Sequence, residues 1–248
     1  MKKLFFLLVA INICLSTTIA QEKKMLTPED AAYLNYEVYP RGMNVKWLAN
    51  TDKYIFPDKE NPNNLMIQEV NGKNANVFLT LDQVNSYLNQ AGLDSVRRIP
   101  NLSWIDNNKA YYYSMDKKNN MINLNLLDIK SKSISKITSM PTEAENMTVA
   151  LPTLKVAYTI DNNLYVADGE NQIQITYNPE NVVAGQSVHR NEFAIDGGIF
   201  WSKDGMKLAF YNMDERMVTD YPLVDITERV ATSKPIKYPM AGMTSHIV

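Results

Sequence analysis

Side chains that could do chemistry gather in one stretch of this 248-residue sequence, residues 185–192. Ser187 and His189 are the residue types of a nucleophile and a general base, and Glu192 follows with Asn191 beside it. A catalytic serine of the α/β-hydrolase type lies in a Gly-x-Ser-x-Gly turn that leads into a helix. This stretch lacks the closing glycine and leads into no amphipathic helix. We therefore predict that Ser187 is not a catalytic nucleophile.

The rest of the sequence supplies no complete catalytic set. No Gly-x-Ser-x-Gly occurs anywhere, and His246 has no partner that the sequence identifies. With two histidines far apart and one cysteine, Cys14, near the N-terminus, we expect no metal site, no disulfide and no cofactor. A net charge of −2 gives no basic surface for nucleic acid. We therefore predict no catalytic residues in this chain, and no peptidase activity of its own.

Residues 1–20 have the pattern of a secretory signal peptide. Lys2 and Lys3 precede an apolar run over 4–13, and small and polar residues lead to Ala20. The run is too short to span a bilayer stably, although a buried N-terminal helix is the alternative. We expect cleavage after Ala20, a mature domain over 21–248, and export to the periplasm or the cell surface of a bacterium.

Two short helices are predicted early in the mature chain. Thr27 caps a first helix that has Pro28 at its first position. The second covers Thr80–Ala91, where Thr80 and Gln83 form a capping box and Gly92 ends the helix.

Four later segments share one pattern, in which an apolar or tryptophan-led strand, a polar turn and an aromatic strand follow one another. They begin at Val45, Leu102, Val149 and Ile199, at a spacing of roughly 50 residues. In the second and third units a further strand and an acidic turn follow, at 121–128 and 162–168. Such repeating hairpins predict an all-β fold, a partial, open β-propeller of about four blades with short helical insertions. A β-sandwich is the alternative, because its strands have similar spacing.

The second half of the chain resembles a known family. Its landmarks are the stretch Ser187–Gly205, the strand Leu208–Tyr211, the run Thr219–Asp225 and the motif Tyr238–Gly242. In this order they resemble the N-terminal propeller of the dipeptidyl peptidase IV family, within the prolyl oligopeptidase group of serine peptidases. The resemblance weakens before residue 150. It implies an exported serine exopeptidase that acts after proline and whose catalytic α/β-hydrolase domain lies outside this sequence.

In that family an acidic motif binds the free N-terminal ammonium of the peptide substrate. The resemblance places Glu192 on one of the two glutamate positions and Asn191 where the other carboxylate would be. Without the resemblance, Glu192 is typical of a solvated surface glutamate. An ammonium offers three donors and needs anionic or carbonyl partners once it is desolvated. A single carboxylate leaves both dipeptidyl and tripeptidyl release open.

The expected partners follow from this resemblance. They are a peptide with a free N-terminus and the missing C-terminal hydrolase domain, and an open set of blades also favours self-association into a homo-oligomer. The alternative function is a non-enzymatic periplasmic propeller that binds a protein or a peptide. A coding sequence that continues into further blades and a Gly-x-Ser-x-Gly turn would favour the enzyme.

Overall fold

The computed structural model describes residues 27–32, 44–188, 194–227 and 229–248, and the chain divides into two units, 1–44 and 45–248. The described part of the first unit is the helix α2 (Pro28–Ala32). Its cap is reciprocal: the Asp30 amide donates to Thr27 Oγ1 at 3.1 Å, and the Thr27 amide donates to Asp30 Oδ2 at 3.2 Å. The predicted first helix is thus confirmed.

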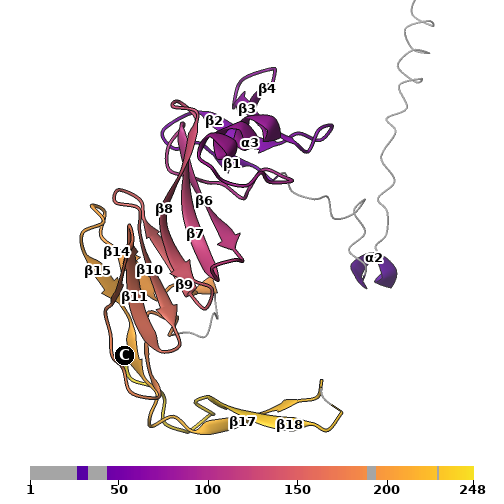
Figure 1. The fold of residues 1–248 in the computed structure, drawn as a ribbon. Helices are drawn as coiled ribbons and strands as arrows, with labels where there is room; N and C mark the ends of the chain where they lie inside the picture. Colours follow the sequence, from indigo (N-terminus) through magenta and orange to yellow (C-terminus); the bar gives the residue numbers. More distant parts are fainter. Residues whose placement is uncertain (1–26, 33–43, 189–193, 228) are drawn as a thin grey trace, which may run out of the picture. The chain divides into compact units, whose positions relative to one another are not determined.

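The second unit contains three four-stranded antiparallel sheets, each formed by strands consecutive in sequence (Figure 1). The first sheet consists of β1 (Lys46–Trp47), β2 (Lys53–Pro57), β3 (Asn64–Glu69) and β4 (Asn76–Thr80). The second consists of β5 (Ser103–Trp104), β6 (Lys109–Asp116), β7 (Met121–Asp128) and β8 (Ser133–Pro141). The third consists of β9 (Glu145–Ala150), β10 (Lys155–Ile160), β11 (Asn163–Asp168) and β12 (Asn171–Gln174).

Shorter pairs of strands follow these sheets. They are β13 (Val182–Ala184) with β16 (Asn212–Asp214), β14 (Ile199–Trp201) with β15 (Leu208–Phe210), and β17 (Asp220–Asp225) with β18 (Thr232–Lys237). All four predicted hairpins are present, as the antiparallel pairs β1–β2, β5–β6, β9–β10 and β14–β15. Each of the first three hairpins begins its own four-stranded sheet, which is the organisation of propeller blades.

The predicted second helix is present as α3 (Leu81–Gln90), with both hydrogen bonds of the capping box between Thr80 and Gln83. Its expected position within the first blade is wrong. Thr80 is the last residue of β4 and also the helix cap, so α3 follows the completed sheet and packs against β4 and β8. Among the described residues, no helix is both long and apolar enough to cross a membrane.

Apolar clusters join each sheet to the next. The first cluster unites α3 and the first sheet with the second, the next unites the second with the third, and the last unites the third with the short strands β13 and β14. Fully buried members include Leu79 and Leu127 in the first cluster, Leu124 and Tyr158 in the second, and Leu164 and Ala184 in the third. Units that bury their apolar faces only against sequence neighbours behave as a repeat array.

Polar contacts also cross between the sheets. Thr138 Oγ1 donates to the Gly169 carbonyl at 2.7 Å, which ties β8 to the turn after β11. The indole Nε1 of Trp201 donates to the Thr148 carbonyl at 3.0 Å, which ties β14 to β9. The tryptophan in the leading strand of the fourth unit therefore links this strand, β14, to the first strand of the third sheet, β9.

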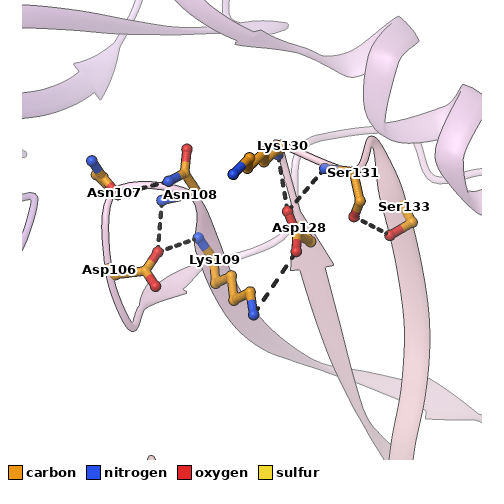
Figure 2. A network of polar contacts seen from close by, with 8 residues as sticks. All are labelled: Asp106, Asn107, Asn108, Lys109, Asp128, Lys130, Ser131 and Ser133. Carbon is orange, nitrogen blue, oxygen red and sulfur yellow. Dashed lines mark hydrogen bonds and ion pairs between the residues drawn. The ribbon is translucent and has the colours of Figure 1, made fainter.

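Asp- and Asn-rich turns close the hairpins, as predicted, and Figure 2 shows two of them in the second sheet. The carboxylate of Asp106 accepts from the amides of Asn108 and Lys109, both at 2.7 Å. Asp128 likewise accepts from the amides of Lys130 and Ser131, at 2.9 and 3.1 Å. An aspartate at such a position satisfies amides that the ladder leaves unpaired, which explains why these turns are acidic.

Candidate functional site

The two predicted binding residues, Asn191 and Glu192, lie outside the described residues, as does His189. The structure therefore does not place them. It does describe both ends of the segment that carries them, 185–188 and 194–198. The geometry of these ends defines where the segment leaves the sheet and where it returns.

The segment between Gly185 and Gly198 interrupts a strand. Strand β13 pairs with β16 so that Ala184 faces Asn212, and β14 pairs with β15 so that Ile199 faces Phe210. Tyr211 is the one residue between β15 and β16. Its carbonyl accepts from the Gly185 amide at 2.8 Å, and its amide donates to the Gly198 carbonyl at 3.0 Å.

Residues on both sides of the segment thus share one partner residue. The chain leaves the sheet after Gly185, returns at Gly198 and continues the same strand with no change of neighbour. The intervening residues 186–197 are therefore an insertion that the sheet tolerates because its own ladder continues past them.

Both glycines are required by their surroundings. Gly185 has φ +70°, and a Cβ there would lie 3.0 Å from Thr159 Cγ2 and 3.1 Å from Leu164 Cδ1. At Gly198 a Cβ would overlap the carbonyl group of Gln186 and lie 2.7 Å from its amide nitrogen. The two ends of the insertion can approach this closely only because both positions lack a side chain.

Two side chains close the base of the insertion. The hydroxyl of Ser187 donates to the Ile195 carbonyl at 2.6 Å, so it bridges the outgoing and returning ends of the segment. Gln186 Nε2 donates to the Asp161 carbonyl at 3.0 Å, which attaches the segment to the β10–β11 turn. These contacts give Ser187 a structural role at the base of the segment.

A cavity of about 260 Å³ lies beside this base. Its lining combines the returning end of the segment and the first strand of the third sheet, as Asn146, Met147, Thr148, Gly185, Asp196, Gly197, Gly198 and Ile199. The sequence stretch 187–205 included Asp196, but nothing in the sequence assigned it a role. Asn146 and Thr148 could not have been assigned either, because they belong to the preceding unit and only the fold brings them here.

The cavity wall is acceptor-rich. Asn146 has φ +52°, and its Nδ2 donates to Thr159 Oγ1 at 2.8 Å. The Thr148 hydroxyl donates to the Asn146 carbonyl at 3.3 Å. The Thr148 hydroxyl and one N–H of the Asn146 amide therefore donate within the wall, and Asp196 contributes a carboxylate. The lining residues include no lysine, arginine or histidine.

The turn after β14 holds Trp201 in place beside this wall. The Ser202 hydroxyl donates to Asp204 Oδ1 at 2.6 Å and the Met206 amide donates to the same oxygen at 3.0 Å. These donors lower the pKa of Asp204 below its usual value, the Ser202 contact contributing most.

His246 lies apart from this cavity lining. Its Nδ1 is buried without a hydrogen-bond partner among the described residues, next to Ile247, which pairs with Asp214. Within the described ranges no three His, Cys, Asp or Glu side chains gather as a metal site would require.

The comparisons with known proteins identify the same group of relatives, the dipeptidyl peptidase IV proteins. A family model of the dipeptidyl peptidase IV (DPP IV) N-terminal region matches residues 123–248. A protein assigned as dipeptidyl-aminopeptidase B in Talaromyces marneffei is 32% identical over 111 residues, which is 38% of this chain and 12% of that protein. Its counterpart in Phaeosphaeria nodorum matches to the same extent. The chain thus spans only a small part of the curated relatives that it matches.

Solved structures extend the likeness to the fold. A protein from Bacteroides ovatus, assigned as a dipeptidyl aminopeptidase IV, has a TM-score of 0.62 and 34% identity over 83% of this chain and 28% of its own. Dipeptidyl peptidase 4 of Porphyromonas gingivalis has a TM-score of 0.58 over 90% of this chain and 32% of its own, with 17% identity, so that likeness concerns the fold alone. The predicted all-β, propeller-type fold is confirmed.

Proposed function

This chain belongs to the family of the dipeptidyl peptidase IV N-terminal region, and we propose that it is the propeller part of an exported serine exopeptidase that acts after proline. In this proposal the propeller gates the cavity that leads to a separate α/β-hydrolase domain, and it binds the N-terminal amine of the peptide. The observation that carries the proposal is the insertion between Gly185 and Gly198, which leaves an otherwise continuous strand.

The insertion is suited to recognition because it is anchored at its base and its described residues, 186–188 and 194–197, belong to no strand. The hydrogen bonds of Tyr211 to both glycines hold its ends, and the Ser187 bridge to Ile195 closes it. Functional side chains commonly lie on such segments, where a rigid scaffold positions them. Glu192 belongs to this segment and is the proposed amine-binding residue, with Asn191 as a neutral neighbour.

The chemistry of the amine favours a carboxylate. A protonated N-terminus has three N–H donors and no acceptor, so a desolvated ammonium requires anions or carbonyl groups around it. A charge-assisted hydrogen bond contributes about 1.5–3 kcal/mol net, which favours a free N-terminus over a blocked one by about tenfold or more. Such a preference makes a peptidase remove residues from the N-terminus.

In the complete protein that carries this chain, Glu192→Gln is expected to lower kcat/KM for peptides with a free N-terminus by at least about tenfold. The reason is loss of the anion that binds the ammonium. Peptides with an acetylated N-terminus have no ammonium, so their slower cleavage should change little. The measurement compares release of a chromogenic group from Gly-Pro and acetyl-Gly-Pro substrates.

The matched control is Glu180→Gln, which removes an exposed carboxylate just before β13. It should leave both substrates unchanged. An equal loss for both substrates with Glu192→Gln would give that residue a structural role and refute the proposal.

Export is part of the same proposal and is carried by the pattern of residues 1–20. We expect the protein, produced in a Gram-negative bacterium, to be recovered outside the cytoplasm with Gln21 as its first residue. Cell fractionation followed by N-terminal sequencing tests this. Recovery of the intact N-terminus in the cytoplasm would contradict it.

A further inference from the structure

Equivalent residues of the units lie on the side that faces the preceding unit. In the second unit, Trp104 of β5 pairs with Ala110 of β6, and Tyr112 lies two residues further along β6, on the same side. The equivalent sets are Val149, Val156 and Tyr158 in the third unit and Trp201, Leu208 and Phe210 in the fourth. All of these residues belong to the apolar clusters that join their unit to the one before it.

The first unit has the same arrangement, but its side chains are not covered. Trp47 pairs with Tyr54, and Phe56 follows on the same side of β2. The three rings form a row, with centroids 5.7 Å apart from Trp47 to Tyr54 and 5.7 Å apart from Tyr54 to Phe56. Met66 and Val77 extend this side across β3 and β4. These five residues, here named the Trp47 face, belong to none of the apolar clusters of the described residues, and Trp47 is 60% exposed.

An apolar outer face is not what the end of a repeat array requires. Terminal units that face water carry polar outer faces, whereas internal units are apolar on both sides. The opposite side of the first sheet is already buried against the second sheet through Leu65 and Leu79. The first unit is therefore built as an internal unit, and a contiguous apolar surface of this kind marks an interaction site.

The interfaces between the other units show what kind of partner fits. At the junction of the third and fourth units, the ring of Trp201 packs against the preceding sheet and its Nε1 donates to the Thr148 carbonyl of β9. Trp104 packs in the same way, although its Nε1 has no hydrogen-bond partner among the described residues. The packing of the ring is thus common to both interfaces. The partner of Trp47 is a sheet whose apolar side and first strand receive that ring.

A sheet of this kind is expected from the rest of the complete protein. The chain spans 28% of the Bacteroides ovatus structure that it resembles, and units arranged radially bring the last one beside the first. The fourth unit is also open on its far side, where Phe200 is 45% exposed and its ring meets that of Tyr211 edge-on. Further units that complete a ring would cover both open sides.

We propose that the Trp47 face binds the last unit of the complete propeller, so that Trp47 closes the ring by side-chain packing. The first sheet takes all four of its strands from residues 46–80, so this closure requires no exchanged strand. This role of Trp47 is independent of amine binding, and its tests do not depend on catalysis.

Photo-cross-linking in the complete protein identifies what covers the face. With Trp47→p-benzoylphenylalanine, irradiation followed by mass spectrometry should link position 47 to a peptide that follows Val248 in the same molecule. The matched control places the same group at Val70, which is 52% exposed in the turn after β3, and should not give this link. A link to residues 21–43, a link between two copies of the protein, or no link at position 47 would overturn the proposal.

Thermal unfolding of the complete protein measures what the contact contributes. Trp47→Ala should lower Tm by about 5 °C or more, because a ring buried between two sheets is removed. Trp47→Phe keeps most of the packing and should lose less than half as much. Val70→Ala should change Tm by less than about 1 °C. If Trp47→Ala is as harmless as Val70→Ala, the Trp47 face is not an interface and the proposal fails.

Discussion

Replacing Gly198 by alanine should destabilise the chain by about 3 kcal/mol or more, because the new methyl group would overlap the carbonyl of Gln186. The overlapping atoms are backbone, so no side-chain rotation relieves the clash. Relief requires that Gly198 or Gln186 moves, and Gly198 is hydrogen-bonded to Tyr211. Since a domain is stable by only about 5–15 kcal/mol, the expected loss is a large fraction of the total.

The neighbouring Gly197 supplies a matched control. A Cβ at this position meets the ring of Phe200 at 3.5 Å, which is an ordinary contact. Gly197→Ala should therefore change the free energy of unfolding by less than about 0.5 kcal/mol. Urea titrations of the two variants followed by circular dichroism make the comparison. Equal stability of both variants would show that the two ends of the insertion are not held as closely as described.

Tyr158→Ala should destabilise the chain by about 3–5 kcal/mol, the range for truncating a buried aromatic side chain. Tyr158 is 0% exposed and belongs to the cluster that joins the second sheet to the third, together with Leu124 and Met140. Its ring stacks on Tyr165 at 5.5 Å between centroids. Truncation would leave a void between two units, neither of which can move into it without losing other contacts.

The variant Tyr158→Phe separates packing from hydrogen bonding. It keeps the ring and removes only the hydroxyl, which donates to Gln172 Oε1 at 3.1 Å. The expected cost is about 1 kcal/mol. Thermal and urea unfolding of both variants should rank alanine well below phenylalanine. If the two variants lose the same amount, the cluster does not hold the sheets together.

The hairpins could be predicted because their determinants are local. In the second unit, for example, Trp104 ends one strand, Asp106 accepts the amides of the turn, and an aromatic strand follows at once. The capping box at Thr80 is equally local, and so the helix boundaries were predicted correctly. The position of this helix after the first sheet is not predictable from the pattern, because the strands β3 and β4 before it lack a leading tryptophan.

The candidate site depends on pairings that the sequence does not reveal. Strand β13 is separated from its partner β16 by the whole insertion and by β14 and β15. The alignment of Gly185 and Gly198 on Tyr211 follows from those two registers together. Asn146 reaches the cavity from another unit. Residue types alone drew attention to this segment, only the resemblance gave it a role in binding an amine, and the roles of its two glycines needed the structure.

The shared pairing partner, Tyr211, allows the insertion to vary independently of the sheets that carry it. Because the strands on both sides of the insertion meet at Tyr211, the stretch beyond the Ser187–Ile195 bridge can change in length or sequence without a change in the register of β13 or β14. The entropic cost of such changes grows only slowly with loop length. If this segment recognises the substrate, as we propose, related chains can acquire different preferences by changes in one short stretch while the packing of the sheets stays the same.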